Sequence, residues 1–322
     1  FTQDVQGLAA MLLFLATGQH QVSQTQLPEP VATTFAQALG APAGVSAASF
    51  ATALETTLQG LRRPDSVNLA IGRRTDVGQR RSLNEDSLLT LETTPVYRSI
   101  STPMGLFAVA DGMGGHSAGD VASQLAIQAI EQHAIDEILS PVAAGGQLPD
   151  AHQWIAATIQ AANRRVYDQR KAAGTDMGTT LVMALFVGNT ATIANVGDSR
   201  AYLLSQDEIV QITTDHSLVE RLVATGQITR VEAAHHPQKN VIYRVIGDKP
   251  EVQADLLEQQ VAPGEALLLC SDGLSGMILD EQIWHIWRTG TSPQDACDRM
   301  VEAANEAGGE DNITVLIVQV IK

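Results

Sequence analysis

Acidic residues stand where apolar segments begin or end, each beside a glycine or an asparagine. The set comprises Asp86, Asp111, Asp198, Asp272 and Asp311. A single aspartate at a turn is as consistent with a local Asx turn as with a metal ligand. Carboxylates that converge repel one another, however, and burying them together is costly without a cation. Because no Cys or His stands at zinc spacing beside them, the all-oxygen set predicts Mg²⁺ or Mn²⁺.

The stretch around Asp111 shows the arrangement most clearly. An apolar run, Leu106–Ala110, reads as a buried strand, and a glycine-rich turn over residues 112–116 follows the aspartate. Residues 117–139 then carry helical spacing. A strand that delivers an acid to such a turn places it at a sheet edge, where the backbone can approach an ion closely. An isolated match of this kind is more often a plain structural turn, so the prediction depends on the other acids.

The other acids lie in similar surroundings. The apolar run Ala266–Cys270 leads into Asp272, and Asp311 comes shortly before the closing strand Ile313–Ile321. Asp198 lies in a Gly-Asp-Ser-Arg turn after a strand. Two metal ions that shared a bridging carboxylate would lower the pKa of a bridging water and hold a phosphorus centre for in-line displacement.

The elements that must position these acids alternate between strands and long helices. Strands are expected at 67–72, 87–91, 179–187, 190–196 and from 201 onward, in addition to those named above. Gly188-Asn189 between two of these strands predicts a hairpin turn. A second long helix is expected at about 151–172. Residues 215–250 are polar and helical and read as an inserted subdomain, which begins with a capping box at Ser217 and Glu220.

Composition and charge exclude several classes of protein. The chain has 322 residues and a net charge of −16, which argues against nucleic acid as a partner. Cys270 and Cys297 are too few for a disulfide framework, so we expect a reduced, cytoplasmic protein. The longest apolar run, Leu8–Ala16, is far shorter than a bilayer span, and we expect no membrane insertion. The chain starts with Phe1, which fits a piece of a longer protein.

Residues 1–66 form a separate N-terminal extension in this interpretation. They hold two helical patterns with a Gln/Pro-rich stretch between them, and nothing in them has catalytic spacing. The segments Asp4–Ala9 and Leu15–Gly18 loosely resemble the late helices of a protein-kinase C-lobe, and residues 46–55 would fit the last kinase helix. The alternative is a helical extension without that ancestry.

The acidic motifs together resemble one family closely. They occur in the order found in the metal-dependent protein phosphatases (PPM, the type 2C serine/threonine phosphatases) of the bacterial type. The motifs are Asn84-Glu85-Asp86, Asp111 to His116, Gly178-Thr179-Thr180, Gly197 to Arg200, Ser271-Asp272-Gly273 and Glu310-Asp311-Asn312. The resemblance covers about residues 67–322. It implies an α+β fold, with a central antiparallel β-sandwich, helices on both outer faces, the metals at one end and the 215–250 segment as a small flap subdomain.

The resemblance also implies roles for individual residues. Asp111 would bridge two tightly bound Mg²⁺ or Mn²⁺ ions, and the Gly112 carbonyl would bind the second. The other implied ligands are Asp272 and Asp311 at the first ion, Glu85 and Asp86 directly or through waters, and Asp198 with Asp272 at a third, weaker site. Arg81 matches the arginine that grips the substrate phosphate, since its planar fork suits a phosphate dianion.

Three positions carry alternatives. Arg81 stands close to other arginines and would otherwise read as part of a solvated basic patch. His116 has the pKa of a general acid, but some members place their acid His where this chain has Met113. His116 therefore stays open between a proton donor and a turn residue, and Asp198 between a third-metal ligand and a turn acid paired with Arg200. We expect His216 and Cys270 to be structural.

The implied activity is hydrolysis of phosphoserine and phosphothreonine in proteins by a metal-activated water, without a phosphoenzyme. The implied partners are phosphorylated proteins and a cognate serine/threonine kinase, and we expect a monomer. Two other functions stay open: a pseudophosphatase that keeps the fold as a binding module, and a phosphatase of small phosphorylated metabolites. Intact acids at every implied ligand position argue against the first.

Overall fold

The computed structural model describes most of the chain, and every structural statement below concerns these residues. They are 2–17, 29–39, 49–54, 57, 67–94, 96–97, 100–101, 103–114, 118–143, 146, 148–234 and 236–321. The chain divides into two compact units, Phe1–Asp65 and Ser66–Lys322. No helix within the described ranges is long and apolar enough to cross a membrane.

The N-terminal unit is helical and has a small core of its own. Helices α1 (Thr2–Thr17) and α2 (Glu29–Leu39) pack on each other. Their buried side chains form one apolar cluster with Phe50, whose ring meets that of Phe35 edge-on at 5.8 Å. This unit therefore buries apolar surface without the second unit.

The second unit contains two antiparallel sheets. The first has the order β1-β13-β12-β9-β10 and the second the order β11-β8-β7-β5-β2, with β6 paired to β5. The strands of the first sheet are β1 (Asn68–Asp76), β9 (Arg200–Leu204), β10 (Ile209–Gln211), β12 (Ala266–Cys270) and β13 (Ile313–Ile321). Those of the second are β2 (Asp86–Thr93), β5 (Met104–Met113), β6 (Gly178–Thr179), β7 (Leu181–Val187), β8 (Thr190–Val196) and β11 (Asp255–Gln260). A separate small hairpin pairs β3 (Val96–Tyr97) with β4 (Ile100–Ser101).

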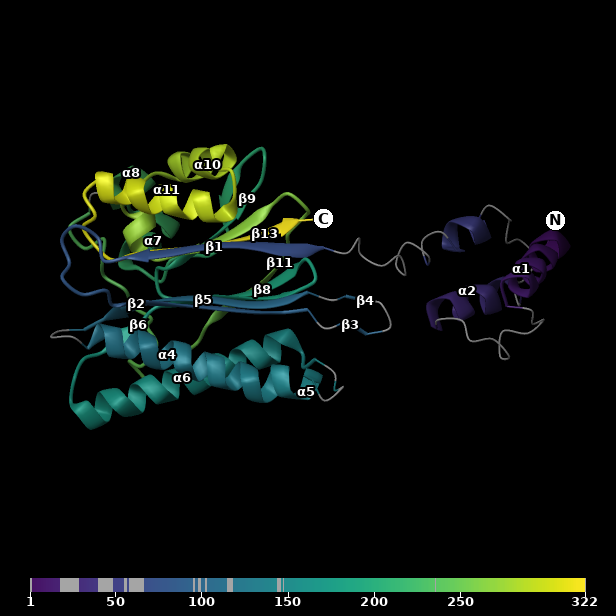
Figure 1. The fold of residues 1–322 in the computed structure, drawn as a ribbon, viewed down its shortest axis with the longest axis horizontal. Coiled ribbons are helices and arrows are strands. Elements are labelled where there is room, and N and C mark those ends of the chain that lie inside the picture. The colour runs from purple at the N-terminus through teal and green to yellow at the C-terminus, as the bar shows by residue number, and fades with distance from the viewer. Residues whose placement is uncertain are drawn as a thin grey trace. The chain divides into compact units, whose positions relative to one another are not determined.

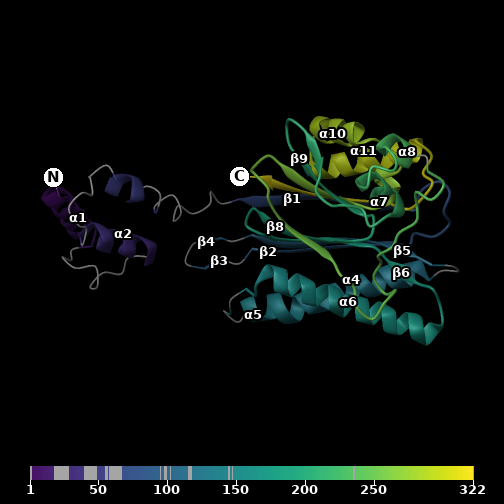
Figure 2. The same ribbon diagram turned by 180° about the vertical axis from the view of Figure 1, so that it is seen from behind.

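The sheets lie face to face, and helices cover both outer faces (Figures 1 and 2). The second sheet carries α4 (Gly119–Ala134), which continues through a π-helical turn (Ile135–Leu139) into α5 (Ser140–Ala143), and α6 (Ala151–Ala173). The first sheet carries α9 (Asp272–Ser275), α10 (Asp280–Thr289) and α11 (Pro293–Glu306). This arrangement confirms the expected α+β sandwich with helices on both faces.

The β5 strand is continuously apolar from Leu106 to Ala110 because both of its faces are covered. Leu106 and Ala108 belong to the core beneath the helices, whereas Phe107 and Val109 belong to the core between the sheets. A strand that is covered on both faces has no solvent side, so it shows no polar alternation. The same reasoning explains the continuous apolar sequence of β12.

Residues 215–250, the flap, contain two short helices, α7 (Leu218–Ala224) and α8 (Arg230–Ala234). The predicted cap is confirmed in one half, since the backbone N–H of Glu220 donates to Ser217 Oγ at 3.3 Å. The other half of the capping box is wrong, because the Glu220 carboxylate pairs with Arg230 of α8 at 3.2 Å instead. Within the flap, Ser217 and Ile242 form a bridge, and Ile246 joins the flap to the sandwich through a bridge with Thr179 of β6.

Candidate active site

The predicted acids converge on one end of the sandwich. In the β2–β5 pairing Asp86 stands directly opposite Asp111. Asp272 comes just beyond the end of β12, after Ser271, and Asp311 comes just before β13, the strand that pairs with β12. The turn that contains Asp198 leads into β9, whose Arg200 is paired with Cys270. Strand pairing thus brings together carboxylates that lie far apart in the sequence.

Burial and mutual repulsion raise the pKa values of these carboxyl groups. Burial, followed by the charges of Asp86, Asp272, Asp198 and Asp311, raises the pKa of Asp111 well above its ordinary value. Burial is also the largest cause for Asp86, whose pKa rises to about 7, and for Asp198, whose pKa rises to about 8. Burial and the charge of Asp311 raise the pKa of Asp272, while a side-chain hydrogen bond with Asp111 opposes the shift.

The donor set fits a hard divalent cation in its chemistry. All side-chain donors are oxygens, and Asp86 Oδ1 and Asp198 Oδ1 are buried without a hydrogen-bond partner in the described part of the chain. A cation would satisfy such atoms and remove the repulsion. As the side chains stand, no three His, Cys, Asp or Glu residues among those described form a group arranged to hold an ion.

Two of the carboxylates face hydrogen-bond donors of the protein. Asp311 Oδ2 accepts from Arg81 Nη2 at 2.7 Å, and Asp86 Oδ2 accepts from Ser271 Oγ at 2.8 Å. An oxygen that served a cation would therefore do so in competition with these donors.

The Asp111 backbone is held by two neighbouring threonines. The Thr180 N–H and the Thr179 hydroxyl both donate to the Asp111 carbonyl at 2.9 Å, and the Asp111 N–H donates to Thr180 Oγ1 at 3.1 Å. The next residue must be glycine, because a Cβ on Gly112 would lie 2.0 Å from the carbonyl oxygen of Gly119. These contacts fix the end of β5 against the start of α4.

The loop that carries Arg81 is held by Asn312. Its Nδ2 donates to the carbonyls of Val77 and Leu83, both at 2.9 Å, and its Oδ1 accepts from the Glu85 N–H at 2.8 Å. Sequence reasoning assigned no role to Asn312, Thr179, Thr180 or Ser271. Their presence inside the short motifs was the available signal.

The contacts of the neighbouring arginines bear on the basic-patch alternative for Arg81 and on the turn-acid alternative for Asp198. The neighbouring arginines do not form one patch, since Arg73 donates to Thr90 at 3.0 Å and Arg74 pairs with Glu302 at 3.4 Å. Arg200 pairs with Asp215, at 2.7 Å between Nη2 and Oδ2, and its charge opposes the rise that burial causes in the pKa of Asp198, without an ion pair between the two among the described contacts.

The remaining predicted residues differ in what the structure shows of them. Glu85 is partly buried beside Gly119, and burial raises the pKa of its carboxyl group. His116 lies outside the described residues. Met113, at the position where some family members have their His, is exposed. Cys270 is fully buried, and burial raises the pKa of its thiol to about 12, which does not suit a nucleophile.

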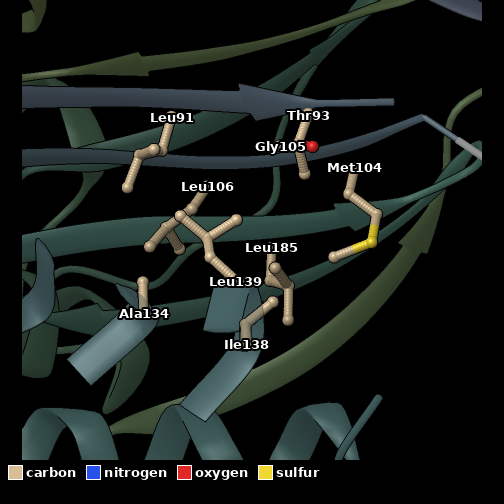
Figure 3. Close-up of a pocket in the computed structure, with 9 residues that line it drawn as sticks. All are labelled: Leu91, Thr93, Met104, Gly105, Leu106, Ala134, Ile138, Leu139 and Leu185. Atoms are coloured by element: carbon tan, nitrogen blue, oxygen red, sulfur yellow. The ribbon is translucent and has the colours of Figure 1, made fainter. Parts of the chain in front are cut away.

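A separate apolar pocket lies at the other end of β5 (Figure 3). Met104, the first residue of that strand, lines it, together with Leu185 of β7, Ala134 at the end of α4, and Ile138 and Leu139 of the π-helical turn. None of its lining residues is titratable. The pocket therefore does not compete with the acidic end of the sandwich as a site for chemistry.

Comparisons with known proteins agree with this geometry. A family model described as protein phosphatase 2C matches residues 80–313. The chain is 38% identical over 248 residues to the serine/threonine phosphatase stp of Listeria innocua, covering 76% of this chain and 94% of that protein. It is 38% identical over 245 residues to the protein phosphatase PhpP of Streptococcus pneumoniae, with the same coverage of 76% and 94%.

Solved structures give the same result. The Mycobacterium tuberculosis serine/threonine phosphatase PstP/Ppp superimposes with a TM-score of 0.67 at 37% identity, covering 79% of this chain and 99% of that one. A structure of the PstP catalytic domain in complex with two manganese ions has a TM-score of 0.67 at 35% identity, covering 80% of this chain and all of that one.

Proposed function

Because the chain belongs to the protein phosphatase 2C family, we propose that its second unit hydrolyses phosphoserine and phosphothreonine in proteins. The observation that carries the proposal is the convergence of Asp86, Asp111, Asp198 and Asp272 at one end of the sandwich, where burial and repulsion raise their pKa values. A site with this excess of negative charge needs a cation before it can accept a phosphate dianion.

We propose that Asp111 and the Gly112 carbonyl bind two Mg²⁺ or Mn²⁺ ions between them. Asp272 and Asp311 complete the first site, and Glu85 and Asp86 contribute directly or through water. Asp198 and Asp272 form a third, weaker site. Ions held there would lower the pKa of a coordinated water and would neutralise charge on the phosphate oxygens. The manganese ions of the PstP structure belong to that protein and support the choice of metal here.

The side chains of this protein then have three tasks. Arg81 lies on a loop at the rim, with 48% of its side chain exposed, and its guanidinium can orient the phosphate. Asp311, its present partner, keeps the guanidinium close to the acids. We propose His116 as a proton donor to the leaving serine or threonine oxygen, with a water held by Asp198 as the alternative donor.

Neither Cys270 nor Ser271 is placed to act as the nucleophile of a phosphoenzyme. The thiol of Cys270 is buried and belongs to the core, and the Ser271 hydroxyl is already engaged with Asp86. We propose direct attack by a metal-activated water, without a phosphoenzyme. The flap, on this proposal, influences the choice of protein substrate more than the chemical step, because loops on rigid scaffolds commonly carry recognition.

The test is the turnover of phosphoserine and phosphothreonine peptides in the presence of Mn²⁺, compared with small phosphorylated metabolites. Preference for the peptides supports a protein phosphatase. Turnover of the metabolites alone would assign the site to small substrates, and no turnover of either would indicate a binding module.

A further inference from the structure

The flap begins with two residues that hold both ends of the turn containing Asp198. Asp215 binds Arg200, the last residue of the turn, in a bidentate contact with two distances of 3.0 Å from Nε and one of 2.7 Å from Nη2. His216 binds Gly197, the first residue of the turn. Its ring Nδ1 lies 3.0 Å from the Gly197 nitrogen, and its own backbone N–H donates to the Gly197 carbonyl at 2.8 Å.

The far side of the His216 ring faces the end of the flap. Its Nε2 lies 3.2 Å from Asp255 Oδ2, on the first residue of β11. Arg244 Nη1 lies 2.7 Å from Asp255 Oδ1 and 2.9 Å from the same Nε2. The ring itself is only 2% exposed. His216 thus lies between the Asp198 turn on one side and, on the other, Asp255 of β11 and Arg244 of the flap.

The donors and acceptors around the ring select one tautomer. The backbone N–H of Gly197 can only donate, so Nδ1 must carry the lone pair and Nε2 the proton. Nε2–H then donates to Asp255 Oδ2, and Arg244 donates to Asp255 Oδ1. The 2.9 Å contact between Arg244 Nη1 and Nε2 brings two donors together in this tautomer and is not a hydrogen bond. Burial lowers the pKa of His216 and the charge of Arg244 acts in the same direction, while the hydrogen bond with Asp255 opposes the shift. The net lowering agrees with a neutral ring that accepts at Nδ1.

The turn needs such support because its geometry is unusual. Gly197 has a φ of +111°, and a Cβ there would lie 2.6 Å from Thr180 Cβ, so the position requires glycine. Its backbone is therefore intrinsically flexible in the unfolded chain, and external contacts must select this conformation. One oxygen of the neighbouring Asp198 carboxylate, Oδ1, is buried without a hydrogen-bond partner among the described residues.

We propose that His216 and Asp255 are positioning residues that hold Gly197, and through it the Asp198 carboxylate, and so couple the base of the flap to the active site. This inference rests on the proposed function for its effect on turnover, while its structural part can be measured without activity. Asp255 is anchored by its pairing with Asn195 of β8, so the sheet supplies the fixed reference for the turn.

Two substitutions at one position separate the two sides of the ring. His216→Asn places an amide oxygen near the position of Nδ1 and can still accept from Gly197. His216→Gln places its amide near Nε2 and can still reach Asp255, but it leaves Gly197 without an acceptor. We expect the Asn variant to keep kcat for p-nitrophenyl phosphate within about threefold, and the Gln variant to lose about tenfold, as for one buried hydrogen bond. KM should change little in both.

Hydrogen exchange of the amides in residues 197–200 is the readout that does not depend on activity. Exchange at Gly197 should rise about tenfold in the Gln variant and stay near the wild-type rate in the Asn variant. Asp255→Ala should also raise the exchange rate at Gly197. Because the Asp255 side chain is 46% exposed, this substitution leaves the core intact. The matched control is Glu258→Gln on the same strand, whose contact with His152 at 3.8 Å is a surface pair, and which should change neither quantity.

The outcomes are distinct. Equal exchange at Gly197 in the wild type, the Gln variant and the Asp255→Ala variant would overturn the inference, and so would equal loss of kcat in the Asn and Gln variants with unchanged exchange. If the two His216 variants do not fold, the exchange rate at Gly197 in the Asp255→Ala variant is the deciding measurement. An inactive wild type whose variants still show the expected exchange pattern would contradict the proposed function and uphold the positioning of the turn.

Discussion

Arg81 and Asp311 form an ion pair of 2.7 Å at the rim of the acidic site, with 48% and 35% of their side chains exposed. An exposed pair of this kind contributes little to stability. Its position is more informative, because it places the chain's candidate phosphate-binding cation directly beside a candidate metal ligand.

The first prediction follows from that pair. Arg81→Ala should raise KM for phosphopeptides and lower kcat/KM by about 10- to 100-fold, the effect of losing charge-assisted hydrogen bonds to the phosphate. The kcat/KM of Arg81→Lys should lie between those of the wild type and of Arg81→Ala, because a lysine keeps the charge but cannot form the bidentate contact. The melting temperature should hardly move. Arg80→Ala is the control, and an equal loss there would indicate a general electrostatic effect.

The second prediction concerns pH and the metal-free protein. In the unfolded chain aspartates ionise near pH 4, whereas the pKa values of Asp86 and Asp198 in the folded protein are about 7 and 8. Between these values the folded state binds more protons, so its stability must fall as the pH rises. The lowered pKa of His216 acts in the opposite direction, but only near and below pH 6.5.

We therefore expect the free energy of unfolding, measured in chelator, to decrease from pH 6.5 to 8 by about 1 kcal/mol per pH unit for Asp198 and by about half of that for Asp86. Asp198→Asn should reduce this slope, and added Mn²⁺ should stabilise the protein more at pH 8 than at pH 6.5. A flat or rising profile in chelator would show that these carboxyls are not held in their protonated form.

The third prediction separates turnover from folding at Asp198. Asp198→Ala should lower kcat at least tenfold and shift its dependence on Mn²⁺ concentration, while the melting temperature changes little. The reason is that Arg200 is bound to Asp215, so removing the Asp198 carboxylate leaves no cation unpaired. Wild-type kcat across a full metal titration would reduce Asp198 to a turn residue.

The fourth prediction concerns the N-terminal unit. A protein that begins at Ser66 should fold and hydrolyse p-nitrophenyl phosphate at a rate comparable to that of the full chain, because the two units have separate cores. A folded but inactive product would mean that residues 1–65 contribute to the site. The loose kinase resemblance of this unit would gain support from kinase motifs encoded upstream of Phe1.

The sequence predicted the parts of the fold that depend on local pattern. The strand predicted at Ile313–Ile321 has the bounds of β13. The helix predicted at about 151–172 agrees with α6, which runs from Ala151 to Ala173. In contrast, β1 continues to Asp76, beyond its expected end at Gly72, because pairing with β13 satisfies the backbone of its polar residues. The helices at 280–289 and 293–306 were not predicted, although Ser292 before Pro293 is a recognisable helix start.

The site was predictable as a set of acids and less so as a geometry. Family motifs identified Asp111 and Asp272, but no local rule places Asp86 opposite Asp111, which depends on the register of β2 and β5. The contact between His216 and Gly197 joins residues 19 positions apart. Its donor and acceptor pattern emerges only when β11 supplies Asp255.

The central claim, a divalent metal centre that hydrolyses phosphoproteins, is tested most directly by phosphopeptide turnover after chelation and metal add-back. We expect activity to vanish in excess chelator and to return with Mn²⁺ or Mg²⁺. Asp111→Asn should be at least as damaging as any other substitution in the acidic set, since a bridging ligand serves two ions. Full activity in excess chelator, with no metal detected in the protein, would contradict the account.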